Sequence, residues 1–200
     1  MSEGADIIGL LAGIEPGSRI DRLRDQRAQA RENAQLSFEA LFEPDDPGTF
    51  SYAERYAVAS FVAQLHGFAT ATAFYIDLLG DEAPDLVDVV RSAAREAQDA
   101  GPAGQYREPG LASESTEGPV WVASHAIDGR LAAALEHAHL LVFRPRESSP
   151  DALAKLVDAG WSADDIVSLS QLISFLAFQL RAAWGLRVLS QNLAEEGAAA

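Results

Sequence analysis

The sequence predicts an all-α protein of about seven helices, with residues 1–200 forming a single domain. Three serines each precede a carboxylate by three residues where an apolar, helix-forming run begins: Ser18 with Asp21, Ser51 with Glu54, and Ser162 with Asp165. Side chains in this pattern cap the amino ends of helices. Apolar residues then recur three and four positions apart, and no stretch alternates convincingly as a half-buried strand does.

The first half of the chain contains three of the expected helices. Residues 1–17 are expected to form an N-terminal arm, and a helix follows over 19–42. The capping box at Ser51 opens the next helix, which ends close to Gly67. We expect Gly67 to tighten or bend the backbone, and a further helix to follow over 68–79.

Four more helices are expected in the second half, over residues 84–100, 127–143, 150–159 and 163–193. Between the first two of these, residues 101–119 are rich in Gly, Pro, Ser and Glu and show no period. We expect an exposed, mobile loop there. The end of the chain, residues 195–200, is expected to be a frayed tail.

The net charge and the amino-acid composition exclude several classes of partner and of chemistry. The chain has 15 Lys and Arg against 30 Asp and Glu, which gives a formal net charge of −15. Such a charge repels phosphate backbones and anionic lipid, so neither nucleic acid nor a membrane is an expected partner. The amino end lacks the features of a signal peptide, and we therefore expect a cytoplasmic protein. Because the sequence has no cysteine, disulfides, zinc ribbons and thiol nucleophiles are excluded.

The last predicted helix is apolar around most of its circumference. A helix of this kind must be covered on every side, either at the centre of a bundle or at a subunit interface. We therefore expect a homo-oligomer. Gln171, Gln179 and Arg181 interrupt the apolar surface, and they either line a ligand pocket or form polar pairs, within the structure or across an interface.

Two of the capped helices begin alike. Phe50-Ser51-x-x-Glu54 matches Trp161-Ser162-x-x-Asp165, and apolar residues follow both at the same offsets. The match indicates either two related helical units or convergence of two amphipathic helices on one capping pattern.

Two segments of the chain resemble the alkylhydroperoxidase D-like, or carboxymuconolactone decarboxylase-like, superfamily. Ser51 to Gly67 is similar to that family's capped helix, and Leu153 to Leu189 is similar to a second block found in its peroxidase-related members. With Leu41-Phe42-x-Pro44 added, the resemblance covers roughly residues 25–192. It implies an all-α, oligomeric fold and a divergent branch of the family.

The resemblance also implies where the family's redox chemistry lies. Active members carry a Glu, two cysteines and a His, which align with Tyr56, Phe68, Ala71 and Tyr75 of this chain. None of the four is retained. A thiol peroxidase of the family type is excluded, because Phe and Ala form no thiolate. Decarboxylase-type members use a His at the position of Tyr75, so that activity is also not expected.

Four candidate catalytic residues remain near the implied site, and each has a structural alternative. Glu54 is either a general acid or base or the third residue of the capping box. His66 transfers protons or bonds to the backbone where the helix ends. Tyr56 and Tyr75 are either pocket hydroxyls or core aromatics.

No metal or cofactor is expected. Glu136 and His139 have the spacing found in dimetal helical bundles, but no second Glu-x-x-His exists in the chain. Dinucleotide, phosphate-loop and nucleophile-elbow motifs are missing as well. The sequence thus favours a cofactor-free small-molecule enzyme or a ligand-binding protein, without deciding between the two. The alternative is a non-catalytic, oligomerising partner of a redox-active relative.

Overall fold

A computed structural model describes residues 6–198 of the chain, with side chains described as far as residue 193. Within this range the protein is all-helical, as predicted, and its two-residue bridge between Gly104 and Thr116 belongs to no strand. The helices are α1 (Ile7–Ala12), α2 (Arg19–Asp25), α3 (Ala28–Phe42), α4 (Tyr52–Leu65), α5 (Ala69–Glu82), α6 (Pro84–Glu96), α7 (Gly129–Phe143), α8 (Pro150–Asp158) and α9 (Ala163–Ala198), with 3₁₀ turns η1 (Pro109–Glu114) and η2 (Pro145–Glu147).

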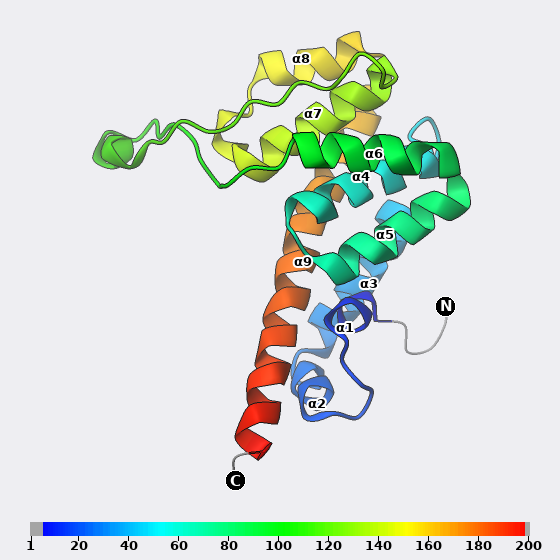
Figure 1. Cartoon of the computed structure of the whole chain (residues 1–200), viewed down its shortest axis with the longest axis vertical. Helices are drawn as coiled ribbons and strands as arrows, with labels where there is room; N and C mark the ends of the chain where they lie inside the picture. Colours follow the sequence, from blue (N-terminus) through cyan, green and yellow to red (C-terminus); the bar gives the residue numbers. More distant parts are fainter. Residues whose placement is uncertain (1–5, 199–200) are drawn as a thin grey trace.

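Helix α4 lies at the centre of the fold and contacts α5, α6, α7 and α9. Most of its buried residues are small or β-branched, which lets neighbouring helices approach it closely. Helix α9 runs the length of the molecule (Figure 1). Helices α4 and α7 pack on its upper part, and α1, α2 and α3 flank the lower part.

The predicted caps form as the sequence indicates. Ser18 Oγ accepts from Asp21 N at 3.2 Å, and Ser162 Oγ accepts from Asp165 N at 3.1 Å. At the start of α4 the capping box is complete, because the Glu54 carboxylate also accepts a hydrogen bond from the backbone N–H of Ser51 at 2.9 Å. These local bonds satisfy amide groups that the first helical turn leaves without partners.

Part of the expected N-terminal arm is a helix packed on the core. In α1 the side chains of Ile7, Ile8 and Leu11 are buried, and α1 contacts α9 and α3. Asp6 caps α1 by accepting from Gly9 N at 3.0 Å. Six residues are too few to display a helical period, so the sequence pattern indicated only an apolar run.

The helix expected over residues 19–42 is divided in two. Helix α2 ends at Asp25 and α3 begins at Ala28. The change of direction allows Arg31, from α3, to form ion pairs with Asp6, Asp21 and Asp25. Good helix formers occupy the whole stretch and no local stop signal marks the break, which is accompanied by these three ion pairs.

The segment 101–119 contains η1 and reaches away from the body of the molecule (Figure 1). Gly104 and Thr116 bond to each other's backbone at 3.1 and 3.2 Å, and these bonds close the base of the projection. The expected tail, residues 195–200, differs from the prediction over its first part, because α9 continues to Ala198.

The two similar capped helices meet at their amino ends. The ring of Phe50 packs edge-on against Trp161, with centroids 5.1 Å apart, directly before α4 and α9 begin. Arg130, from α7, lies over the Trp161 ring at 4.0 Å. The repeated sequence pattern therefore corresponds to two helix starts that contact each other.

Arg130 connects both helix starts by hydrogen bonds. Its Nε donates to Glu54 Oε1 at 2.7 Å, and its two terminal nitrogens donate to the carbonyls of Gly160 at 2.7 Å and Thr49 at 2.9 Å. Asp165 Oδ2 lies 3.5 Å from Nη2. Burial raises the pKa of Asp165, but hydrogen bonds from Thr49, Ser162 and Arg130 outweigh it and lower that pKa below its usual value.

We predict that Arg130→Lys destabilises the fold. A lysine keeps the charge but cannot hold Glu54 and two carbonyls in a fork or stack on Trp161, so we expect a loss of about 2 kcal/mol in the free energy of unfolding. Urea denaturation at pH 7 measures the loss. Arg107→Lys, in the exposed segment 101–119, is the matched control. Equal stability of the two variants would contradict the role given to Arg130.

Candidate functional site

The structure separates the four candidate catalytic residues. Glu54 and Tyr56 lie in the first turns of α4, whereas His66 follows its last residue. Ten residues of helix separate Tyr56 from His66, which is about 15 Å along the axis. The four side chains do not converge on one pocket.

Glu54 already has partners for its carboxylate. One oxygen accepts from Ser51 N and Ser51 Oγ at 2.9 and 3.0 Å, and the other accepts from Arg130. Its capping role is therefore observed. These three donors occupy both oxygens of the carboxylate, so Glu54 is poorly placed to contact a ligand.

The positions implied for the redox relay lie mostly in the solid core. Phe68, Ala71 and Tyr75 are all buried, and Phe68 packs edge-on against Trp184 with ring centroids 5.7 Å apart. Tyr56 is half-buried and stacks on Tyr52. None of the four lines any of the larger surface pockets in the described part of the chain.

Tyr75 is held by a buried polar pair. Its hydroxyl donates to Gln179 Oε1 at 2.5 Å, and its carbonyl accepts from Ser60 Oγ at 2.8 Å. Burial raises the pKa of Tyr75, so the hydroxyl stays protonated. The Nε2 group of Gln179 is buried and has no hydrogen-bond partner among the described residues. Gln179 thus pairs with Tyr75 inside the subunit, one of the roles that the sequence left open.

His66 is the one candidate that borders a pocket. Its Nδ1 lies 3.0 Å from Val62 O, and burial lowers the pKa of the ring. The pocket measures about 310 Å³. Its walls come from α7, α9 and the segments beside them, and they include Leu141, Ile173 and Arg181. A neutral imidazole facing apolar walls is compatible with a small ligand, but no second proton-transfer group lies there.

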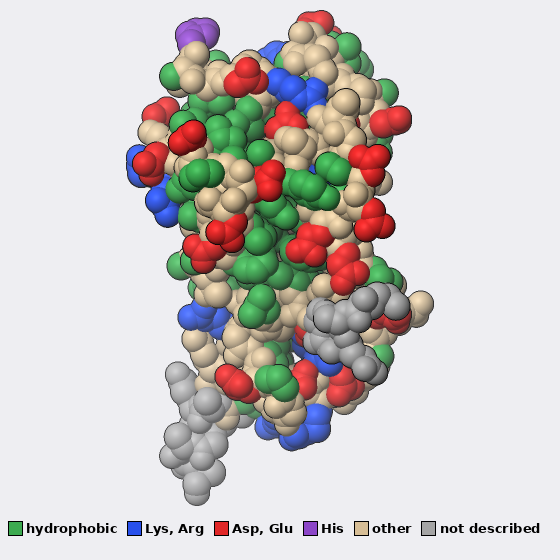
Figure 2. Space-filling view, turned by 90° about the vertical axis from the view of Figure 1, so that its right-hand side faces the viewer, with side chains coloured by type: hydrophobic (Ala, Val, Ile, Leu, Met, Phe, Trp, Pro, Cys, Tyr) green, Lys and Arg blue, Asp and Glu red, His purple; other side chains and the backbone are tan. Residues whose placement is uncertain are grey.

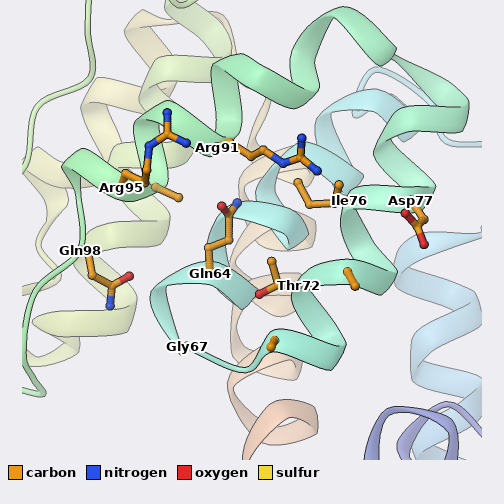
Figure 3. Close-up of a pocket in the computed structure, with 11 residues that line it drawn as sticks. Gln64, Gly67, Thr72, Ile76, Asp77, Arg91, Arg95 and Gln98 are labelled. Carbon is orange, nitrogen blue, oxygen red and sulfur yellow. The ribbon is translucent and has the colours of Figure 1, made fainter.

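A larger groove lies between α6 and the elbow that joins α4 to α5. Figure 3 shows this groove, which measures about 700 Å³. Gly67 forms the elbow in the left-handed conformation, with φ +66°, which side chains other than glycine rarely adopt. The sharp turn allows α4 and α5 to diverge in front of α6. Small or apolar residues line much of the groove: Gly67, Ala69, Ala73, Ile76 and Ala94.

The polar lining of the groove consists of two arginines, two amides, the hydroxyl of Thr72 and the carboxylate of Asp77. Arg91 and Arg95 are one turn apart on α6, and the side chain of Gln64 lies between them (Figure 3). Gln64 Nε2 donates to Ser60 O at 3.0 Å, and Gln98 Nε2 donates to Leu65 O at 3.3 Å. These bonds fix both amides. Within the described part of the chain, no carboxylate lies within ion-pair distance of Arg95, and Arg91 has only the exposed Asp88 at 3.6 Å.

Glu136 and the two buried histidines of α7 all make contacts that support the fold. Glu136 accepts from Ala123 N at 3.0 Å and so holds the segment before α7. His139 packs between Trp121 and Phe143, and His137 Nε2 lies 3.2 Å from Ser170 Oγ. In residues 6–193, no three His, Asp or Glu side chains are grouped closely enough to bind a metal ion.

No family model matches the chain, and no curated protein sequence matches it either.

Helix α9 is long and apolar enough over Ala163–Leu193 to cross a membrane, and its most apolar window of 18 residues has a mean hydropathy of 1.4. A core helix meets the same criterion, and 44% of its most apolar window is buried in this fold.

Sequence reasoning did not identify the groove. The available signal was the pair Arg91 and Arg95, separated by one helical turn in a chain where acids outnumber bases two to one. Nothing in the sequence indicated that Gln64 and Gln98 would come to lie beside them. That proximity depends on how α4 and α6 pack.

We predict that Tyr75→Phe is destabilising because it leaves the buried amide of Gln179 with no partner for either atom. An unsatisfied buried polar group costs about 1–3 kcal/mol. The double variant Tyr75→Phe, Gln179→Leu should recover most of the loss, since it removes both polar partners. Urea denaturation of the three proteins tests this double-mutant cycle. If Gln179→Leu does not rescue the tyrosine variant, the pair does not contribute as described.

We predict that stability falls as the pH decreases from 7.5 to 5.5. Burial lowers the pKa of His66, His137 and His139 below the ordinary 6.5. The unfolded chain therefore binds more protons below pH 6.5. Stability is complete above that pH and is lost as the pH falls towards the folded pKa values. Denaturation midpoints at several pH values measure the slope.

The exposed His125 provides the control for this pH dependence. His125→Gln should leave the slope unchanged, whereas His66→Gln should reduce it. A midpoint independent of pH over this range would show that the buried imidazoles do not resist protonation.

Proposed function

We propose that this protein binds a small organic anion in the groove between α6 and the α4–α5 elbow. The observation that carries the proposal is the placement of Arg91 and Arg95 on the same wall of that groove, without a strong ionic partner for either among the described residues. A guanidinium group donates two parallel hydrogen bonds to a carboxylate, which makes arginine well suited to such ligands.

The remaining lining favours an anion attached to an apolar body. Ala69, Ala73 and Ile76 offer an apolar surface beside the arginines, whereas the amide oxygens of Gln64 and Gln98 accept hydrogen bonds. Ligand sites are commonly apolar clefts with a few polar groups that fix orientation. The groove volume of about 700 Å³ is in the range of sites for small molecules.

The charges in the groove lining also favour an anion, because two arginines outnumber the single carboxylate, that of Asp77. Arg91 and Arg95 repel each other at this spacing, and an anion placed between them relieves the repulsion. The chain as a whole has the opposite character, with a net charge of −15 and many carboxylates around the apolar area seen in Figure 2. The protein as a whole repels anions, so retention depends on these few local groups.

We also propose that the chain belongs to the family that its sequence resembles. A member of the alkylhydroperoxidase D-like superfamily without its relay would keep the helical scaffold and lose thiol chemistry. The all-α architecture, the capping box at Ser51 and the elbow at Gly67 support this assignment. The wall of the groove holds no nucleophile with an adjacent base, which favours binding over catalysis.

The second candidate function is oligomerisation with a protein partner. One observation favours it: α9 keeps large apolar side chains exposed along one side. The two functions are compatible, because the exposed positions of α9 and the groove involve different residues.

We predict that benzoate binds in the groove and that benzamide, which has the same shape without the charge, binds at least tenfold more weakly. Arg95→Gln should weaken benzoate binding about tenfold, which corresponds to the loss of one charge-assisted hydrogen-bond pair of roughly 1.4 kcal/mol. NMR titration of the amide signals of α5 and α6 gives both the affinity and the location.

Lys155→Gln removes the same charge from the exposed surface of α8 and is the matched control. It should leave benzoate binding unchanged. Equal responses to benzoate and benzamide, or equal effects of the two substitutions, would rule out the arginine pair as the anion site.

A further inference from the structure

Two neighbouring hollows lie where α2 and the start of α3 meet the lower part of α9 (Figure 1). They measure about 320 and 410 Å³, and Leu23 and Gln26 border both of them, so the hollows adjoin. We refer to the two together as the α2–α9 trough, in which residues 19–31 form most of one wall and residues 178–193 form the other. The trough shares no lining residue with the groove beside α6.

The α9 wall of the trough is entirely apolar. Its lining residues are three or four positions apart and therefore share one helix face: Phe178, Ala182, Leu186, Leu189 and Leu193. This wall extends about 22 Å along the helix axis. Phe178 is 53% exposed and Leu189 is 37% exposed, so the wall keeps apolar surface in contact with water. An elongated apolar ligand would cover that surface.

The opposite wall of the trough is rich in positive charge. Five of the chain's 15 basic residues line the trough: Arg19, Arg22, Arg24, Arg27 and Arg31. Among the described residues that line it, none is Asp or Glu. In the whole chain the acids outnumber the bases by 30 to 15. The trough is thus a locally positive surface on an acidic protein, and it favours an anionic ligand.

Arg27 is the arginine of the trough that is best placed to bind an anion. Arg24 and Arg31 already form ion pairs with Asp6, which lies behind them at the start of α1. Arg27 stands at the corner between α2 and α3 and borders the same hollow as Phe178. Within the part of the chain that the structure describes, its side chain makes no ion pair and caps no helix. Its guanidinium group is therefore open to a ligand.

We propose that the α2–α9 trough binds a free long-chain carboxylate, with the carboxylate on Arg27 and the alkyl chain along the apolar wall of α9. A guanidinium group donates two parallel hydrogen bonds to a carboxylate, and the alkyl chain leaves water as it covers the leucines. Arg19 and Arg22 border the far hollow, where their aliphatic stems can cover the chain while their charges stay in water. This site does not depend on the function proposed for the groove.

A bilayer is a poorer match to the trough than a single free molecule. The net charge of −15 repels an anionic membrane surface as a whole, whereas one carboxylate inside the trough meets mainly the local arginines. The apolar wall is also concave against α2, so it encloses an alkyl chain from two sides and does not present a convex face to a flat surface.

An NMR titration with decanoate, kept below the concentration at which it forms micelles, tests the site. Decanoate should shift the amide signals of α2 and of residues 186–193. Hexanoate should bind at least tenfold more weakly, because it removes four fewer methylene groups from water. The uncharged 1-decanol should also bind at least tenfold more weakly, because it cannot pair with Arg27. An affinity for either compound equal to that for decanoate would overturn the proposal.

Two substitutions separate the contributions of the charge and of the apolar wall. Arg27→Gln should weaken decanoate binding about tenfold, which corresponds to roughly 1.4 kcal/mol. Arg107→Gln, in the exposed segment 101–119, is the matched control and should bind normally. Leu189→Ser should reduce the difference between decanoate and hexanoate, and Val157→Ser on α8 should not. Helical circular dichroism should be the same for all four variants. Equal binding by the two arginine variants would overturn the proposal.

The same titrations distinguish this site from the groove and from a membrane surface. Arg27→Gln should still bind benzoate, and Arg95→Gln should still show decanoate shifts in α2. Decanoate shifts confined to α5 and α6 would overturn the trough as a site and leave the groove proposal standing. Sedimentation of the chain with phosphatidylglycerol vesicles, without any response of α2 to decanoate, would overturn the free carboxylate as its ligand.

Discussion

One guanidinium group fixes the geometry on which the fold depends. The carboxylate of Glu54, two backbone carbonyls and the ring of Trp161 all meet at Arg130. Through these contacts α7 holds the first turns of α4 and α9 together. Those two helices in turn form much of the core, with α4 at its centre. Since both helices begin at the same point, their separation and crossing are determined there, and α5 and α6 pack around the result.

The part of this arrangement that sequence could predict is the local part. Ser51 and Glu54 are three residues apart, and Ser162 and Asp165 have the same spacing, so their capping bonds follow from helical geometry alone. Arg130 lies 76 residues from Glu54 in the chain. No periodicity or spacing rule relates two residues at that separation, and only the packing of α7 brings them together.

The errors in element assignment have the same cause. Residues 7–12 form α1 because α9 and α3 offer an apolar surface for them, and the break between α2 and α3 is accompanied by ion pairs made by Arg31. The helix α9 that supports α1 is distant from it in sequence, whereas Arg31 pairs both with Asp6 and with two carboxylates of the neighbouring α2. The candidate site was assigned by analogy with a thiol relay, and that analogy did not reveal that Phe68, Ala71 and Tyr75 lie on the buried face of α5.

Adjacent faces of α5 have different surroundings. Phe68, Ala71 and Tyr75 point to the core, where the Tyr75–Gln179 bond closes the interior. Ala69, Thr72 and Ile76, each one residue further along, line the groove. On the proposed function, ligand chemistry has moved from one face of this helix to the next. The contact of α1 with α9 has a separate consequence, because these two helices are far apart in the order of synthesis. A ribosome makes α2 to α8 before α9, so the apolar side of α1 lacks part of its packing surface while those helices are translated.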